Sequence, residues 1–365
     1  MQNDEILSIL RHFSLDGRLA AAEEINSGNI NATYHLALEQ AGTTREYILQ
    51  RINTYVFREP GRMMENIVAV TEHLRASLCA LGESTERRVL HMLPADDGQR
   101  MFENAAGCWR IYPYIGGACA YDTVDAAAFR EVGRGFGCFQ RLLADYPAER
   151  LFVSIPDFHN TEKRYAQLRA AIQADEAGRA KDVQPEIAFL LQRQERLCSI
   201  VRLIESGELP LRVTHNDTKS NNVMLDSETG KALCVIDLDT VMPGSVLYDY
   251  GDAIRFGANT AAEDEPDTGR IALDMEKTEA FTQGFIEETN GFLLREELQR
   301  LPLGVEVMTG ELAIRFLTDY LNGDKYFKIN APDHNLIRTR AQIALLRDVE
   351  SKRDALQKMV DGMIG

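Results

Sequence analysis

Residues 211–257 read LRVTHNDTKSNNVMLDSETGKALCVIDLDTVMPGSVLYDYGDAIRFG, and this stretch decides the fold. It opens with a short apolar run, passes through a dense polar loop and returns through a second apolar run, residues 232–236, which ends on carboxylates. Asp226, Ser227 and Gly230 lie just before this second run, and such residues favour a turn. We therefore predict strands that frame a loop of polar side chains.

Four polar residues of this stretch have the spacing that phosphoryl transfer from a nucleotide requires. In protein kinases an H-R-D-x-x-x-x-N loop supplies the catalytic aspartate and a metal-binding asparagine, and a later aspartate completes the metal site. Asp217 matches the residue that orients and deprotonates the attacking hydroxyl. Asn222 and Asp237 match the two Mg²⁺ ligands. Lys219 adds a positive charge that stabilises the transferred phosphoryl group.

A plain polar loop between two strands is the alternative interpretation, because Asp and Asn are common turn formers. A single short motif would not decide between the two. Here four positions at fixed offsets agree with one mechanism, and strand-like runs flank them on both sides. A multi-part motif of this kind favours the catalytic interpretation.

The stretch resembles the aminoglycoside phosphotransferase and choline kinase branch of the protein-kinase-like fold. That branch has the catalytic loop H-x-D-x-x-x-x-N and a metal strand ending I-D-x-D/E. More narrowly, R-V-T-H-N-D-T-K-x-N-N, I-D-L-D-T-x-M-P-G-S and R-F-L-x-D-Y-L-x-G-D are similar to motifs of the N-acetylhexosamine 1-kinases. The resemblance runs from Ile30 to Arg340.

The resemblance implies an α+β, protein-kinase-like two-lobed fold. Residues 1–115 would form the N-lobe, a nucleotide-covering β-sheet with one helix, and residues 116–365 a larger, mainly helical C-lobe. ATP would be the phosphoryl donor, Mg²⁺ the metal and the C1 hydroxyl of N-acetylglucosamine or N-acetylgalactosamine the acceptor. Arg315 and Tyr326 would contact the sugar beside Asp217.

The N-lobe is expected to contribute Gly28, Asn29 and Asn31 to nucleotide binding. They lie ahead of an alternating segment that resumes at Tyr34, where a kinase-like fold covers the phosphates with backbone N–H groups. The signal is weak by itself, because a lone Gly-Asn in a hairpin is more often a simple turn.

The next predicted strand, residues 45–53, departs from the kinase pattern. Where a kinase has a lysine that pairs with the phosphates, this sequence has Gln50 followed by Arg51. Alternation directs the two to opposite faces, and we assign Gln50 to the nucleotide. Kinase-like folds pair this lysine with a glutamate from the following helix. The helix predicted over residues 63–81 contains two candidates, Glu65 and Glu72, and the sequence does not distinguish between them.

The run WRIYPYI, residues 109–115, predicts the last N-lobe strand and the connection to the C-lobe. Tyr112 and Tyr114 are the candidates for contact with adenine. An edge strand ended by Pro113 is the alternative. Helices are expected over residues 126–146, 163–180, 185–206, 276–290, 305–321 and 336–363.

Four further polar residues have assignments that the sequence leaves open. His159 is interpreted as part of a loop that caps a helix through Asn160 or Thr161, in preference to a substrate contact. Asp239 is equally compatible with a second metal-binding group and with a structural one. Asp249 and Asp252 are expected to serve helix starts and the lobe structure.

Composition narrows the functional class. The chain has 365 residues with 45% hydrophobic and 26% charged residues, as in an ordinary globular protein, and no apolar run approaches the roughly 20 residues of a membrane span. The net charge of −16 argues against a nucleic-acid partner. Six scattered cysteines suggest neither disulfides nor zinc. We expect a cytoplasmic monomer whose partners are a nucleotide and a sugar.

Two other functions stay open. A related kinase could act on an aminoglycoside, choline or another sugar, and an acidic surface would attract a polycationic aminoglycoside. The second open function is that of a non-catalytic pseudokinase scaffold. The unusual Gln50 and Arg51 favour it, whereas the intact Asp217, Asn222 and Asp237 argue against it.

Overall fold

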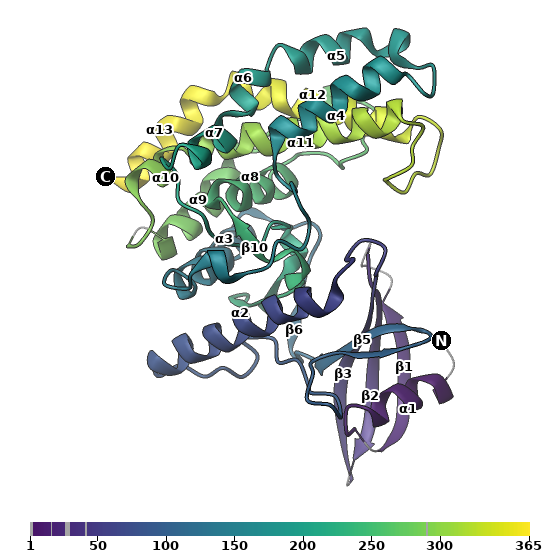
Figure 1. Ribbon diagram of the computed structural model, residues 1–365. Helices are drawn as coiled ribbons and strands as arrows, with labels where there is room; N and C mark the ends of the chain where they lie inside the picture. The colour runs from purple at the N-terminus through teal and green to yellow at the C-terminus, as the bar shows by residue number, and fades with distance from the viewer. Residues whose placement is uncertain (1–2, 16, 26–29, 41, 290) are drawn as a thin grey trace.

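The computed structural model describes residues 3–15, 17–25, 30–40, 42–289 and 291–365. These residues form a small lobe built on a β-sheet and a larger lobe that is mainly helical (Figure 1). In Figure 1 the small lobe lies at lower right and the helical lobe fills the upper half of the view. This arrangement confirms the α+β, two-lobed fold predicted from the sequence.

The small lobe contains a five-stranded antiparallel sheet in the order β1-β2-β3-β5-β4. Its strands are β1 (Arg18–Ile25), β2 (Ala32–Gln40), β3 (Thr43–Ile52), β4 (Phe102–Asn104) and β5 (Gly107–Pro113). Helix α1 (Asn3–Arg11) packs its apolar side on one face of this sheet. Ile6, Leu10, Leu36 and Trp109 are all buried in that contact. The alternation of apolar residues along β2 therefore places one face of the strand in the core.

Helix α2 (Pro60–Ala80) belongs as much to the large lobe as to the small one. Proline near its first position fits the start of a helix, and a stripe that includes Ile67 and Leu74 is buried. This stripe shares a core with Phe139 and Leu238 of the large lobe. Figure 1 shows α2 running beneath the helical lobe.

Asn66 attaches α2 directly to the large lobe. Its Nδ2 donates to the carbonyl oxygens of Phe152 and Val241 at 2.7 and 3.0 Å, and its Oδ1 accepts from the backbone N–H of Phe152 at 2.8 Å. The side chain is 4% exposed, so these bonds satisfy a polar group that has little access to water.

Two small sheets in the large lobe frame the predicted catalytic stretch. Strand β7 (Arg212–Thr214) pairs with β10 (Met242–Gly244), and β6 (Ala118–Cys119), β8 (Val223–Asp226) and β9 (Ala232–Val235) form a three-stranded sheet in the order β6-β8-β9. The strands predicted around the polar loop are therefore present. The proposed lobe boundary between residues 115 and 116 falls in the segment that joins β5 to β6.

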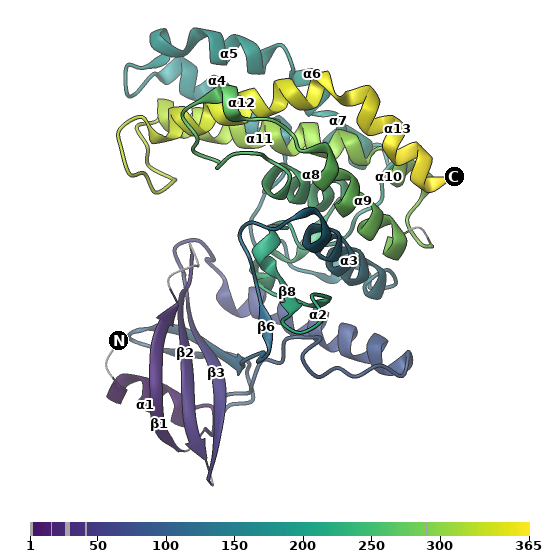
Figure 2. The ribbon, with the colours of Figure 1, turned by 180° about the vertical axis from the view of Figure 1, so that it is seen from behind.

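Helices surround these sheets and build most of the large lobe (Figure 2). They are α3 (Ala126–Leu142), α4 (Thr161–Ala174), α5 (Gln184–Leu191), α6 (Gln194–Leu197), α7 (Ser199–Glu205), α8 (Val246–Gly257), α9 (Met275–Thr289), α10 (Arg295–Gln299), α11 (Leu301–Leu321), α12 (His334–Ser351) and α13 (Arg353–Ile364). Helix α11 is buried along almost its whole length and is the central element of this lobe.

Two of the predicted helices are interrupted. The segment expected as one helix over residues 185–206 is divided into α5, α6 and α7, and the segment over residues 336–363 breaks at Lys352 into α12 and α13. At each break the apolar spacing continues on the next helix, so periodicity alone does not reveal the interruption. None of the helices within the described part of the chain is both long and apolar enough to cross a bilayer.

Candidate active site

The predicted catalytic loop connects β7 to β8 and is held by a carboxylate from α8. Asp249, in the first turn of α8, accepts the backbone N–H groups of His215 and Asn216 at 2.9 and 2.7 Å. Gln140 also donates to it, at 2.8 Å. Asp252, one turn along α8, accepts the N–H of Thr218 at 3.2 Å. The sequence interpretation gave both carboxylates a general structural role and missed their hold on this loop.

The backbone of the loop turns through an unusual conformation at Asn216, whose φ is 64°. Asparagine tolerates this left-handed region better than most residues. Its side chain closes the turn, because Nδ2 donates to the carbonyl oxygens of Thr240 and Thr214 at 2.9 and 3.1 Å. Gly244 fits here for a steric reason, since a Cβ would lie 2.3 Å from Thr214 Oγ1.

His215 is buried beneath the loop, where its ring meets Phe136 and Phe139 edge-on. Its Nε2 contacts the carbonyl oxygen of Ile236 and its Nδ1 contacts the N–H of Asp217. A carbonyl only accepts and an N–H only donates, so the ring has its hydrogen on Nε2.

Asp217 and Lys219 face each other at the end of the loop. Lys219 Nζ lies 2.9 Å from Asp217 Oδ1, and the two side chains are 31% and 24% exposed. Burial opposes the charge on Lys219, but Asp217 outweighs it and raises the pKa of the ammonium group above its ordinary value. A carboxylate and a cation thus stand together where a hydroxyl can approach, as phosphoryl transfer requires.

The two residues predicted to bind the metal, Asn222 and Asp237, lie close to Asp217. Asn222 Nδ2 donates to the carbonyl oxygen of Asp217 at 2.7 Å, which leaves its Oδ1 as the group available to a cation. Asp237 has a φ of 59° and an exposed side chain. Desolvation within the site, then the charges of Asp239 and Asp217, raise the pKa of Asp237 to about 6. Asp239 and Asp217 act on this solvent-exposed side chain as like charges, which favour its neutral form.

An amide oxygen and an acidic residue crowded by other carboxylates suit a hard divalent cation, so the residues fit Mg²⁺. Within the described ranges no cluster of three or more His, Cys, Asp or Glu side chains forms a metal site. Two protein ligands nevertheless match a Mg²⁺ ion that is shared with nucleotide phosphates.

The residues predicted to bind the nucleotide from the small lobe are Gly28, Asn29, Asn31 and Gln50, and the structure describes only the last two. Gly28 and Asn29 lie outside the described residues. Asn31 and Gln50 both face the interior between the lobes, where Asn31 Nδ2 donates to Asp239 at 2.6 Å and Gln50 Oε1 accepts from Arg110 at 2.9 Å. The sequence interpretation missed Arg110 entirely.

The two tyrosines of the connection also differ. Burial raises the pKa of the Tyr112 hydroxyl, and its side chain packs in the core shared by the lobes. Tyr114 is 36% exposed and its ring lies 4.4 Å from that of His35. The N–H of Tyr114 donates to the carbonyl oxygen of Glu46 at 3.0 Å, so this donor is already used. Contact between Tyr114 and adenine would therefore have to come from another of its groups.

The two residues predicted to contact the phosphoryl acceptor lie in the C-terminal half of α11, for Arg315, and in the segment after this helix, for Tyr326. The guanidinium of Arg315 stands over the rings of Phe158 and Phe327, 5.5 Å from each centroid. Tyr326, 67% exposed, meets Phe327 edge-on. Neighbouring Arg164 has its pKa lowered by burial and by the charge of Arg315, so two cations lie close together on this surface.

A short bridge links this surface to the catalytic loop. His159, beside Phe158 in the chain, is buried and contacts Glu311 Oε1 through Nδ1 at 3.0 Å and the carbonyl oxygen of Asn216 through Nε2 at 3.3 Å. Asn160 caps α4 by accepting from Lys163 N–H, as predicted. His159 itself is more than a capping-loop residue, because it joins α11 to the residue before Asp217.

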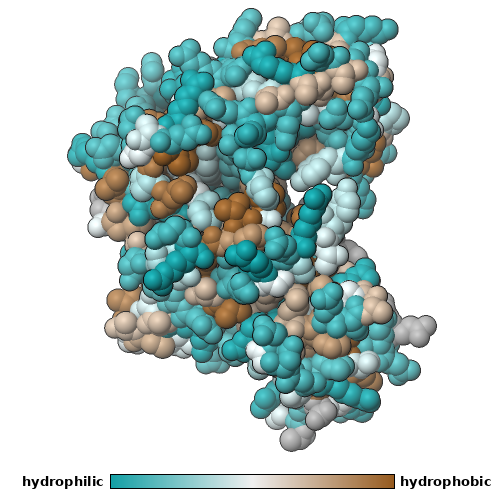
Figure 3. All heavy atoms as spheres, viewed as in Figure 1, coloured by the Kyte–Doolittle hydropathy of each residue, from teal (hydrophilic) through white to brown (hydrophobic). Residues whose placement is uncertain are grey.

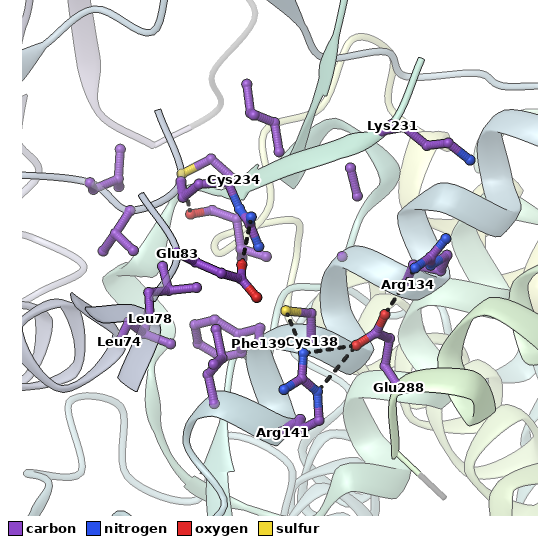
Figure 4. Close-up of a pocket in the computed structure, with 18 of the residues that line it drawn as sticks. Leu74, Leu78, Glu83, Arg134, Cys138, Phe139, Arg141, Lys231, Cys234 and Glu288 are labelled. Carbon is purple, nitrogen blue, oxygen red and sulfur yellow. Dashed lines mark hydrogen bonds and ion pairs between the residues drawn. The ribbon is translucent and has the colours of Figure 1, made fainter. Parts of the chain in front are cut away.

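The surface is hollowed between the small lobe and the helical lobe in Figure 3, with hydrophilic side chains covering most of the face in view. A separate cavity of about 450 Å³ lies among α2, α3 and β9 (Figure 4). Leu74 and Phe139 line it, while Arg134 and Arg141 converge on Glu288 at its side. None of the predicted catalytic or metal-binding residues lines this cavity, so it is distinct from the site.

The fold and the site together define a small-molecule phosphotransferase of the kinase-like type, in which a carboxylate and a cation face each other beside two side chains predicted to hold a metal. Sequence comparison agrees with this. The profile of the phosphotransferase enzyme family matches residues 21–281, and the chain belongs to that family.

Solved structures agree on the fold. A spectinomycin phosphotransferase with bound ADP and spectinomycin matches 100% of this chain and 98% of its own, with a TM-score of 0.55 and 13% identity. A choline kinase from Cryptosporidium parvum matches 100% and 99%, with a TM-score of 0.61 and 11% identity. An aminoglycoside phosphotransferase from Alicyclobacillus acidocaldarius matches 98% and 96%, with a TM-score of 0.60 and 10% identity. The fold is therefore protein-kinase-like, as the sequence predicted.

Proposed function

We propose that the chain is a cytoplasmic, ATP- and Mg²⁺-dependent kinase that phosphorylates the anomeric C1 hydroxyl of an N-acetylhexosamine. Its substrate would be N-acetylglucosamine or N-acetylgalactosamine. The observation that carries the proposal is the His159 bridge, which brings the surface around Arg315 within two side chains of Asp217. The motifs that resemble those of the N-acetylhexosamine 1-kinases lie in these same elements.

In this proposal Asp217 orients the C1 hydroxyl and takes its proton, while Lys219 balances the negative charge that develops on the transferred group. Asn222 and Asp237 hold Mg²⁺, which neutralises charge on the ATP phosphates when it is bound. Arg315 and Tyr326 hold the hydroxyl and N-acetyl groups of the sugar. An arginine donates to such oxygens in a fixed geometry, and an aromatic ring packs on the apolar face of a sugar.

The charge on the acceptor surface separates this proposal from an aminoglycoside kinase. Arg164 and Arg315 are close enough to repel each other. A polycationic antibiotic would add further positive charge there, which costs affinity, whereas a neutral sugar would not. The net charge of −16 of the whole molecule favours a cationic substrate. The pair of guanidinium groups on the acceptor surface favours a neutral one at the site itself.

The test is ATP- and Mg²⁺-dependent phosphorylation of N-acetylglucosamine, N-acetylgalactosamine, glucose, choline and kanamycin, with phosphorus NMR locating the new phosphate. We expect phosphate on C1 of the N-acetyl sugars. Reaction of choline or kanamycin instead would refute the acceptor assignment while leaving the catalytic residues in place. No reaction with any acceptor, together with intact nucleotide binding, would favour the non-catalytic scaffold.

A further inference from the structure

Strand β3 lacks the lysine with which kinase-like folds hold the nucleotide phosphates. Arg51 is exposed, and Gln50 is half-buried opposite Arg110 in the β3–β5 ladder. The glutamates considered as lysine partners, Glu65 and Glu72, are both exposed on α2. The lysine–glutamate pair is therefore missing from the described small lobe, and a different set of contacts connects the sheet to the segment that carries Asp237 and Asp239.

Arg110 occupies this region from the neighbouring strand, β5. Its Nε donates to Gln50 Oε1 at 2.9 Å, and Gln50 Nε2 in turn donates to Thr33 Oγ1 at 3.1 Å. Gln50 of β3, itself held by Thr33 of β2, thus fixes the position of the guanidinium. The Arg110 side chain is only 3% exposed, so its position is set by the protein and not by solvent.

The partner of Arg110 is Asp239, two residues beyond the metal-ligand candidate Asp237. Arg110 Nη1 forms an ion pair with Asp239 Oδ1, and the Asp239 side chain is 4% exposed. The other oxygen, Oδ2, accepts from Asn31 Nδ2 at 2.6 Å, and Asn31 Oδ1 accepts the N–H of Asn53 at 3.0 Å. Asp239, in the short helical turn that follows β9 and Asp237, is therefore joined to two separate parts of the small lobe.

Both oxygens of Asp239 are used within the protein, so the geometry favours a structural role for this residue over a second metal ligand. The pair is not explained by stability alone. A buried ion pair gains little net free energy, because desolvation of the two charges offsets their attraction. What it supplies is a fixed distance between the groups that it joins.

We propose that Arg110 is a positioning residue for phosphoryl transfer. Through Asp239 it holds Asp237 in register with the small-lobe sheet and with the segment at Asn31, in place of the missing lysine–glutamate pair. The inference rests on the nucleotide-dependent chemistry of the proposed function and not on the identity of the acceptor.

The experiment measures Mg²⁺-dependent ADP binding by calorimetry and steady-state kinetics with ATP as the varied substrate. In R110M we expect ADP affinity with Mg²⁺ and kcat/KM for ATP to fall about 10- to 100-fold, the range typical for loss of an outer contact that orients a metal site. The acceptor KM is expected to stay unchanged. R110K retains the charge but not the fork that reaches both Gln50 and Asp239, and should be intermediate.

Two further variants separate positioning from folding. The double variant R110M/D239L removes both buried charges, which commonly preserves or raises stability, and should fold yet still lose Mg²⁺-dependent ADP affinity. The control is R353M, which breaks a two-bond pair with buried Glu306 between α13 and α11. We expect it to lower stability and leave ADP binding unchanged.

Wild-type ADP affinity in a folded R110M or R110M/D239L protein would overturn the proposal. So would an equal loss of affinity in R353M, because the effect would then follow from stability alone. ADP binding needs no acceptor, so the result can be interpreted even if the sugar assignment is wrong.

Discussion

The Nε2 atom of His215 lies 2.8 Å from the carbonyl oxygen of Ile236, the residue before Asp237. On the other side of the ring, Nδ1 accepts the N–H of Asp217 at 3.3 Å. One imidazole therefore joins the loop that carries the proposed base to the segment after β9 that carries the proposed metal ligand. Its position below both makes it a support for their spacing.

We predict that H215F lowers kcat about 10- to 100-fold, because phenylalanine keeps the packing against Phe136 and Phe139 but removes both hydrogen bonds. Steady-state kinetics and a thermal unfolding scan would check this. The fall in kcat should persist at temperatures well below the unfolding transition. An unchanged kcat in the folded variant would show that the loop and strand keep their spacing without the ring.

For D217N we predict a fall in kcat of about 10²- to 10⁴-fold, the usual contribution of a general base. Mg²⁺-dependent ADP binding should be retained, since Asp217 acts on the acceptor. The matched control is D145N, an exposed carboxylate that pairs with His73 away from the loop. Substantial remaining turnover in D217N would assign proton transfer to another group.

For R315M we predict an increase of about tenfold or more in the acceptor KM, as expected for loss of a charged hydrogen bond, with the ATP KM unchanged. R347M is the control, because Arg347 also stands over an aromatic ring, that of Phe189, but away from the acceptor surface. If the two variants had the same acceptor KM, Arg315 would not contact the acceptor.

A pH-dependent contribution to stability is predicted for Glu306. Burial opposes its ionisation, but hydrogen bonds from Arg353 and Arg196 outweigh burial and lower its pKa below the ordinary 4.5. A lowered pKa in the folded state stabilises the protein above 4.5, and this contribution is lost as the pH falls through the lowered value.

E306Q should therefore reduce the free energy of unfolding by about 3 kcal/mol near neutral pH, as when a buried pair is broken. The difference from wild type should shrink as the pH falls below 4.5. Denaturant titrations at several pH values would measure it, with activity at neutral pH as the control for folding. A difference that stayed constant with pH would show that the charge of Glu306 is not involved.

The catalytic and metal-binding candidates could be predicted from the sequence because they lie within one short stretch. Asp217 and Asn222 share a single loop, and their spacing is visible in the sequence. The pair of Arg110 and Asp239 could not be found in this way, because 129 positions separate the two residues and their meeting depends on how the lobes pack. Asp249 was recognised only as a helix-start residue for the same reason.

The fold class was predictable and the helix boundaries were less so. Apolar spacing identified α3 and α11, yet the same spacing ran unbroken across the divisions between α5, α6 and α7. A chain that changes direction while keeping one side buried leaves no gap in its hydrophobic pattern. Such divisions are set by tertiary packing, which a local pattern does not contain.

The hydrogen bonds of Asn66 have a consequence for regulation. Protein kinases are commonly switched on and off by moving the helix that corresponds to α2 relative to the large lobe. Here that helix is bound to the large lobe at Phe152 and Val241, and Arg110 binds the small-lobe sheet to Asp239 of the same lobe. We expect an enzyme that stands permanently assembled, whose rate in the cell follows the supply of its two substrates and not an activating signal.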